Sequence, residues 1–200
     1  MAWNCIPRVQ LKKLVSMSTK YKATETDTAY FITITTVEWI DVFTRLNQKY
    51  AIINSLDYCQ KHKELEIYAY CLMSNHLHLL CKGINGVLLS DIMKDFKKFT
   101  EKKIIENILN EPESRKEWML PLFKKACDHL KRDQTYKVWQ NGYHAEVTTS
   151  NWFIKQKLNY IHQNPVVEKI VAYPEDYYFS SARNYASLSY PLQVEVLNIF

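Results

Sequence analysis

The sequence predicts an α+β fold in which helices cover one face of an antiparallel sheet. Segments that alternate apolar and polar residues, as strands do, take turns with segments of helical periodicity, in the order strand, helix, strand, strand, helix, strand, helix. No Gly/Ser/Pro-rich linker divides the 200 residues, which are 47% hydrophobic and suit one domain with a sizeable core. We therefore expect a single domain over 1–200, with an N-terminal extension (1–24), a basic insertion (111–136) and a C-terminal tail (187–200).

The first half of the chain predicts a strand, a helix and a hairpin. Residues 29–36 alternate and are rich in β-branched and aromatic types, which is typical of a strand. Asn47 is a plausible N-cap for a helix that ends near His62. Two strand-like runs follow at 65–73 and 76–82, and the two residues between them form turns readily. These two strands should pair as a hairpin.

A second long helix is predicted after the hairpin, and an irregular segment follows it. Ser90 should cap this helix, which ends near Asn110, and Phe99 belongs to its apolar stripe. The segment 111–136 is polar and basic, and Pro121 interrupts its weaker helical pattern. We therefore treat this segment as an insertion without an assigned form.

The last part of the chain predicts two short strands and a final helix. The strands are expected at 136–140 and 144–149, after which Ser150 or Asn151 caps a helix that runs to the Asn164–Pro165 boundary. The first six elements match the split βαβ pattern of a ferredoxin-like antiparallel sheet with helices on one face. The C-terminal, tyrosine-bearing helix is then an addition to that pattern.

Charge and aromatic content are compatible with a nucleic-acid partner. The formal net charge is +5, from 26 basic and 21 acidic residues, and 14% of the residues are aromatic. Basic grooves with aromatic platforms hold single strands, because phosphates attract cations and unpaired bases stack on flat rings. The same side chains can equally form a packed core and a solvated helix face, so composition alone proves no partner.

Cysteine usage and hydropathy exclude two other classes. The five cysteines form an odd set without a CxxC pair, which indicates small core residues and neither a disulfide framework nor a zinc knuckle. The longest apolar run, residues 67–73, is far shorter than the roughly 20 residues needed to cross a bilayer. We expect a cytoplasmic protein with no membrane partner.

The first candidate site is the sequence His76-Leu77-His78 on the second strand of the hairpin. Side chains at i and i+2 leave a strand from the same face, so both imidazoles can converge on one ion while Leu77 points into the core. Such a pair taken alone is more often a solvated sheet face than a metal site.

The second candidate site lies on the final helix. Phe153, Lys157, Tyr160 and Asn164 form one stripe at helical spacing, beside an apolar stripe that can dock on the domain. This spacing brings a phenol, an amine and a carboxamide to one edge of the helix. A lone tyrosine in such a position is more often a boundary residue with a hydrated hydroxyl.

Five segments together resemble the single-tyrosine HUH transposase family, in particular its REP-associated branch, over about residues 25–187. A histidine pair on a strand, followed at this distance by a tyrosine helix that ends in YIxxNP, is specific, whereas the pair alone is weak. The insertion and the first 20 or so residues depart from the family pattern. The segments are YAYCLMSNHLHLL (68–80), DIMKDFKKFT (91–100), VWQNGYH (138–144), NYIHQNPV (159–166) and PEDYYFSSARNYA (174–186).

The resemblance implies an enzyme that cuts and rejoins hairpin-flanked single-stranded DNA through a 5′-phosphotyrosine. Carried over residue by residue, it makes His76 and His78 the metal ligands, Asn164 a third ligand, and Tyr160 the nucleophile, with Mg²⁺ or Mn²⁺ as the metal. Two imidazoles and an amide oxygen leave coordination positions open, which suits a Lewis acid better than a structural zinc. The protein would be nucleoid-associated, and relatives include both homodimers and monomers.

Further residues are candidates for supporting roles. We expect Lys157 to offset charge near the tyrosine or the phosphate, and His144 to orient DNA or support the site. His162 lies about 200° away from Tyr160 around the helix, so it should be a packing or surface residue rather than a ligand. The candidates for DNA-phosphate contacts are basic and predict binding that weakens steeply with salt; they are Lys94, Lys97, Lys98, Lys102 and Arg183.

Two other functions compete with this interpretation. One is a non-catalytic single-stranded nucleic-acid-binding protein on the same fold, which would use the histidines and the tyrosine for stacking; the Gly/aromatic strand motif of RNA-recognition domains is absent from the sequence. The other is a zinc hydrolase, but no HExxH motif, third histidine or suitably spaced acid accompanies the pair. A covalent adduct with DNA would distinguish the transposase from both.

Overall fold

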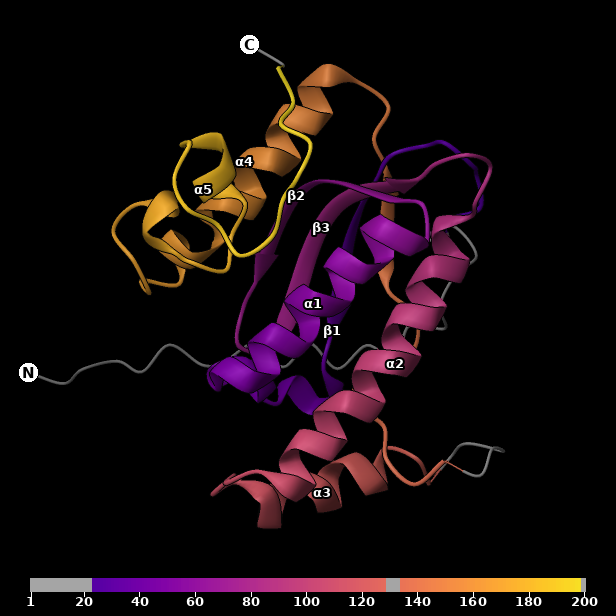
Figure 1. The fold of residues 1–200 in the computed structure, drawn as a ribbon, viewed down its shortest axis with the longest axis vertical. Coiled ribbons are helices and arrows are strands. Elements are labelled where there is room, and N and C mark those ends of the chain that lie inside the picture. The colour runs from indigo at the N-terminus through magenta and orange to yellow at the C-terminus, as the bar shows by residue number, and fades with distance from the viewer. Residues whose placement is uncertain (1–22, 129–133, 199–200) are drawn as a thin grey trace, which may run out of the picture.

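The computed structural model describes residues 23–128 and 134–198, which form a four-stranded antiparallel sheet with helices on both of its faces (Figure 1). The strands are β1 (Tyr30–Thr35), β2 (Leu65–Leu72), β3 (His76–Gly83) and β4 (His144–Val147), in the order β2-β3-β1-β4. Every pairing in the sheet is antiparallel. This is the ferredoxin-like strand order, and it confirms the predicted α+β fold.

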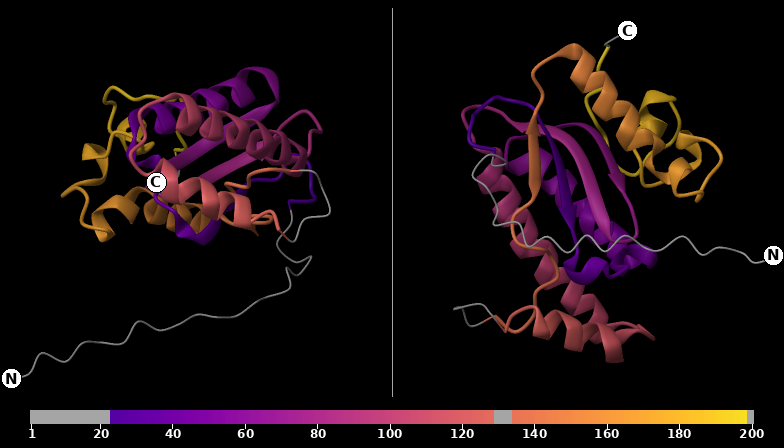
Figure 2. Two further views of the ribbon diagram at one scale, coloured as in Figure 1. Left: turned by 90° about the horizontal axis from the view of Figure 1, so that it is seen from below. Right: turned by 180° about the vertical axis from the view of Figure 1, so that it is seen from behind.

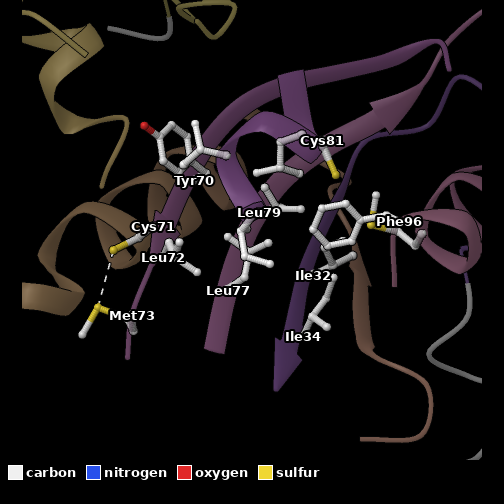
Figure 3. Close-up of a cluster of buried hydrophobic side chains, with 14 of the residues drawn as sticks. Ile32, Ile34, Tyr70, Cys71, Leu72, Met73, Leu77, Leu79, Cys81 and Phe96 are labelled. Carbon is white, nitrogen blue, oxygen red and sulfur yellow. Dashed lines mark hydrogen bonds between the residues drawn. The ribbon is translucent and has the colours of Figure 1, made fainter. Parts of the chain in front are cut away.

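Two long helices cover one face of the sheet. α1 (Leu46–His62) and α2 (Leu89–Asn110) lie side by side in front of the strands in Figure 1. Between them and the sheet is an apolar core, where fully buried Ile32, Leu77 and Leu79 meet Phe96 from α2 (Figure 3). Each such side chain stabilises the fold by roughly 1.5–3 kcal/mol on burial. Because strand residues alternate, the neighbours of these core residues project from the opposite face.

The opposite face of the sheet carries α4 (Asn151–Val167), the predicted tyrosine helix (Figure 2). Leu158 and Ile161 on its inner side are buried, and the helix packs on β2 and β3. Ser150 caps its start, since the Ser150 Oγ accepts a hydrogen bond of 3.2 Å from the Phe153 N–H. The additional helix therefore packs on the sheet face that α1 and α2 leave uncovered.

The prediction that this helix stops before Pro165 is wrong, because the helix continues to Val167. Proline removes the hydrogen bond that its N–H would have donated to the Ile161 carbonyl, and its ring crowds that carbonyl, but its fixed φ fits a helix. Pro165 is buried, and its carbonyl accepts a hydrogen bond of 2.9 Å from the Ile170 N–H. The continuation keeps Asn164 in regular helix, one turn beyond Tyr160.

Three predicted details of the first two helices are also wrong. α1 begins at Leu46, so Asn47 lies inside it, and its Oδ1 contacts the Gln48 N–H at 2.8 Å. Ser90 lies inside α2, whose N-cap residue Leu88 has no side-chain cap. Phe99 is 61% exposed, because the buried side of α2 passes through Phe96 and Thr100 instead.

The insertion contains a helix, α3 (Lys116–Lys125), which includes Pro121 and buries Met119 and Phe123. The strand predicted at 136–140 is reduced to one bridge between Thr36 and Trp139, and β4 ends at Val147 rather than at residue 149. Residues 129–133 and most of the predicted N-terminal extension lie outside the described residues.

The C-terminal segment closes the free edge of β2. The chain contacts that strand between η4 (Pro174–Asp176) and α5 (Ala182–Tyr185), and again after α5. The Leu72 and Glu195 N–H groups donate to the carbonyls of Phe179 and Ile67, both at 2.9 Å. These bonds satisfy backbone groups that an edge strand would otherwise expose.

The structure also bears on the cysteines and on membrane-spanning helices. Four of the five cysteines fall in the described part of the chain, and all four are buried. Within the same part, no helix combines the length and apolar character needed to span a bilayer.

Candidate active site

The two histidines of β3 project from the sheet face that carries α4. Their ring centroids are 4.6 Å apart. His78 is only 4% exposed, and burial lowers its pKa to about 3. Burial also lowers the pKa of His76. Both rings are therefore neutral near pH 7, which is the form of imidazole that binds metal ions.

A hydrogen bond at Nδ1 orients each ring. His78 Nδ1 lies 2.8 Å from Thr33 Oγ1, and His76 Nδ1 lies 2.7 Å from Asn75 Oδ1. Because an amide oxygen can only accept, the His76 proton is on Nδ1 and its Nε2 carries the lone pair. The Asn75 amide nitrogen in turn donates to Asp41 Oδ1 at 3.0 Å. Such outer contacts fix the ring of a metal-binding histidine and its tautomer.

Asn164 of α4 completes a group of three possible ligands. Its Nδ2 lies 3.4 Å from His78 Nε2, and its Oδ1 is buried without a hydrogen-bond partner in the described chain. An unpartnered buried oxygen is unusual and calls for an explanation such as an ion. The described residues contain no group of three His, Cys, Asp or Glu side chains that could hold a metal ion, so a third protein ligand beside the histidine pair would be of another kind, such as this amide oxygen.

Tyr160 lies beside the same histidines, in the same chain. Its ring centroid is 5.1 Å from that of His78 and 5.8 Å from that of Phe31 on β1. The residue is 48% exposed, so about half of its surface is open to solvent. The structure thus brings together the four residues His76, His78, Tyr160 and Asn164.

Lys157, one turn before Tyr160, is held in place by an acid that sequence reasoning missed. Its Nζ lies 2.9 Å from Glu146 Oε1 and 4.4 Å from the centroid of the Phe31 ring. Glu146 Oε1 also lies 3.2 Å from His144 Nε2. The strand alternation of β4, which puts residues 144 and 146 on one face, was the available signal for this acid.

These side chains line one cavity of about 930 Å³. Beyond the residues that the sequence singled out, its walls include Trp39, Tyr143, Glu146 and Glu168. Trp39 ends a single short helical turn, where no periodicity marks it. Glu168 lies four residues beyond Asn164 and continues the same stripe, but the expected end of the helix at Pro165 hid this relation. The cavity has both cationic and anionic walls, with a neutral imidazole pair between them.

Comparison with known proteins identifies the family. Residues 24–120 match the model of the family described as "Transposase IS200 like". Over these residues the chain belongs to the IS200-like transposase family. The match includes His76 and His78 and ends before α4. None of the curated proteins matches the chain.

The fold of this transposase is similar to one described as "Structure of the REP associates tyrosine transposase bound to a REP hairpin". The two structures superpose with a TM-score of 0.57 over 93% of this chain and 95% of that chain, at 18% sequence identity. The likeness extends past the family match, so it includes the part of the transposase that carries α4.

The structure does not bring the predicted phosphate-binding cations of the transposase into the cavity. Lys94, Lys98 and Lys102 are exposed on α2, on the other side of the sheet, where a role in DNA binding remains a prediction. Lys97 instead donates from Nζ to the Gln140 and Gly142 carbonyls, at 2.8 and 2.6 Å, and so holds a loop of the cavity wall. The Arg183 guanidinium donates to the carbonyls of Ser189 and Glu175 in the C-terminal segment.

His162 of the transposase is a packing residue, as the helical spacing predicts. Its Nε2 lies 2.9 Å from Ser181 Oγ, and its ring contacts Tyr185 at a centroid distance of 5.0 Å. Burial lowers its pKa from the ordinary value of 6.5 to about 4. The folded transposase therefore holds this imidazole in its neutral form.

We expect this burial to make the stability of the transposase fall in acid. Between pH 6.5 and pH 4 the unfolded chain binds a proton at His162 and the folded chain does not. The contribution of His162 to the free energy of unfolding is therefore fully present above pH 6.5 and is lost as the pH falls below it. At pH 4.5 the loss from this residue is about 2 kcal/mol. Denaturant unfolding at pH 7 and pH 4.5 should give a smaller pH difference for His162→Gln than for wild type. An equal pH difference in the free energy of unfolding for the two proteins would contradict the prediction. His78, whose pKa is also lowered, is present in both proteins and does not affect the comparison.

Proposed function

We propose that this transposase cuts and rejoins single-stranded DNA through a covalent bond between Tyr160 and a DNA 5′-phosphate. The observation that carries the proposal is the convergence, in one chain, of the Tyr160 ring on an oriented, neutral histidine pair, with 5.1 Å between the Tyr160 and His78 centroids. Tyr160 is about half exposed, so a role in packing alone would not explain why its ring lies beside the histidine pair. The family match supports a reaction on DNA.

The three potential ligands fit Mg²⁺ or Mn²⁺. His76 and His78 would bind through Nε2, and the buried, unpartnered Oδ1 of Asn164 accounts for a third ligand. Three protein ligands leave coordination positions open for phosphate oxygens and water, as in a catalytic site, and these oxygen donors together with the amide oxygen suit Mg²⁺ or Mn²⁺. Bound there, the ion would act as a Lewis acid that offsets negative charge on the oxygens of the scissile phosphate.

In this proposal the chain's own chemistry centres on the Tyr160 hydroxyl. Its oxygen attacks the phosphorus and loses its proton, the bond between phosphorus and the 3′ oxygen breaks, and that oxygen leaves as a 3′-OH after taking up a proton. Joining is the reverse: a 3′-OH attacks the phosphotyrosine, the bond from phosphorus to the tyrosine oxygen breaks, and the phenol regains its proton. One phosphoester replaces another at each step, so no ATP is needed.

Within this mechanism we assign Lys157 the offsetting of charge at the reacting phosphate. Its ammonium group lies in the cavity wall beside Glu146, and its side chain is only 17% exposed. Lys157→Ala should lower the single-turnover cleavage rate on the order of a hundredfold, as removal of one charge-stabilising donor does. Lys155→Ala, an exposed change on the same helix, is the matched control. Cleavage by Lys157→Ala at the wild-type rate would refute this role.

The proposed substrate is single-stranded DNA with a hairpin. The similar structure is described as bound to a REP hairpin, and on that likeness we place this chain in the REP-associated branch. One chain supplies both the histidines and the tyrosine, so a homodimer is not required to complete the site. Acting on DNA, the protein would work at the nucleoid.

Incubation with labelled single-stranded hairpin DNA and Mg²⁺ tests the proposal. A labelled band that migrates with the protein on a denaturing gel is the expected result, because a phosphotyrosine bond survives denaturation. Binding of the same DNA without any covalent product, over a range of flanking sequences and with Mn²⁺ as well, would favour the non-catalytic binding protein instead.

A further inference from the structure

Besides Tyr160, one further aromatic side chain of the cavity is largely exposed. Trp39, at the end of the short helix η2 (Val37–Trp39), is 59% exposed and lines the cavity. Its ring meets His76 edge-on, with 6.1 Å between the centroids and 71° between the planes. Phe31, in the same cavity, is by contrast 4% exposed. An exposed indole beside a polar site offers a flat face on which another ring can stack.

The backbone holds Trp39 there at a cost. Glu38 and Trp39 have φ values of 50° and 56°, the left-handed region that bulky residues rarely adopt. Among the described non-glycine residues with such a backbone, Trp39 alone is apolar. The turn is fixed by the bond from the Trp39 N–H to the Thr36 carbonyl at 3.2 Å, and by the bond from the Asn75 amide to the Trp39 carbonyl at 3.3 Å. Strain that a scaffold maintains in this way is concentrated at functional sites.

The strained turn and the histidine pair share a support. Asn75 accepts from His76 through Oδ1 and donates to the Trp39 carbonyl through Nδ2, so one side chain fixes the position of both. The indole is therefore held in a set position relative to the site where the phosphate would bind, although little packs against the ring itself.

Tyr160 and Trp39 flank different members of the histidine pair. Tyr160 contacts the ring of His78, and Trp39 contacts the ring of His76. In an in-line displacement at phosphorus the leaving oxygen departs on the side away from the nucleophile. If the phosphate lies at the histidines, the nucleotide that leaves with the 3′-OH then extends from the site on the side of Trp39.

We propose that Trp39 is a stacking platform for the unpaired base of the nucleotide immediately 5′ to the scissile phosphate. This inference rests on the proposed function, because the cleavage reaction defines which nucleotide leaves. Every base has a flat face, so the contact would contribute affinity and position rather than strong sequence preference.

A coupling experiment tests the stack. The cleavage position is first mapped with wild-type protein. Binding to uncleaved hairpin DNA is then measured in the Tyr160→Phe background, with intact DNA and with DNA that lacks the base either 5′ or 3′ of the cleaved bond. Trp39→Ala should weaken binding to intact DNA by about 5- to 100-fold, the range of one base stacked on an aromatic ring. Removal of the 5′ base should weaken DNA binding by the protein that retains Trp39 by a similar factor. When the base and the indole are both removed, the loss of binding free energy should be smaller than the sum of the two single losses.

Controls separate stacking from a structural effect. Trp39→Phe should keep most of the affinity, and Trp118→Ala, a half-exposed tryptophan on α3, should leave binding unchanged. The proposal would be overturned if the affinity losses from Trp39→Ala and from removal of the 5′ base were independent. It would also be overturned if the effect of Trp39→Ala depended on the 3′ base instead of the 5′ base. Failure of the proposed function would be seen separately, as the absence of a covalent adduct when Trp39 and Tyr160 are both intact.

Discussion

Tyr160→Phe should abolish the covalent protein–DNA adduct while leaving hairpin binding close to that of wild type. The change removes only the phenolic oxygen, and the ring that contacts His78 and Phe31 remains. Loss of a covalent nucleophile lowers the reaction rate by at least about a thousandfold. A denaturing gel with labelled DNA measures the adduct, and a filter-binding assay measures affinity.

The cavity offers its own control for this change. Tyr143 also lines the cavity, but burial raises the pKa of its hydroxyl to about 12, which makes it a poor source of a phenolate. Tyr143→Phe should therefore still form the adduct. Because each chain holds its own histidines and tyrosine together, a mixture of Tyr160→Phe and His78→Ala proteins should form none. An adduct in Tyr160→Phe protein alone, at the wild-type rate, would rule out Tyr160 as the nucleophile.

Asn164→Ala should raise the concentration of Mg²⁺ or Mn²⁺ needed for half-maximal cleavage by about tenfold or more. The change removes the buried Oδ1 that has no hydrogen-bond partner in the described chain. Mutation of an outer-shell partner of a metal ligand typically costs about 10- to 100-fold in metal affinity, so loss of a ligand should cost about tenfold or more. A titration of the cleavage rate against the metal concentration measures the effect, and a chelator should stop the wild-type reaction.

Two further variants show whether the oxygen or only the helix matters. Asn164→Asp keeps an oxygen ligand, so the metal concentration that it needs for half-maximal cleavage should be no higher than that of wild type. Asn159→Ala, an exposed change on the same helix, should alter nothing. If Asn164→Ala and wild type had the same metal requirement, Asn164 would not be a ligand.

The sheet and the long helices could be predicted from the sequence because the periodicity of apolar residues that marks each element lies within that element. Alternation in residues 29–36 and 65–82 placed three strands, and the histidines fell on the correct face for the same reason. The ends of the elements were less predictable, since tertiary contacts decide them. Pro165 stays inside a helix because its ring is buried, and residues 136–140 lose their strand where α2 side chains bind the backbone, as Glu101 Oε2 does with the Val138 N–H at 2.9 Å.

The candidate site divides in a similar way. Residues at fixed spacing on one element, such as Tyr160 and Asn164, could be grouped from the sequence. A residue that reaches the cavity from a separate turn of the chain could not be grouped, and Trp39 is an example. Lys97 shows the converse: it belongs to a basic cluster in the sequence, but its ammonium group is bound by two carbonyls of the cavity wall.

Mass spectrometry of the digested adduct tests most directly whether the α4 phenol is the group that reacts with DNA. Trypsin should release residues 158–169 as one peptide, in which Tyr160 is the only tyrosine. After reaction with hairpin DNA and Mg²⁺, followed by nuclease treatment, we predict that this peptide gains the mass of a 5′-linked nucleotide. A nucleotide attached to any other peptide, with this one unmodified, would contradict the proposed site.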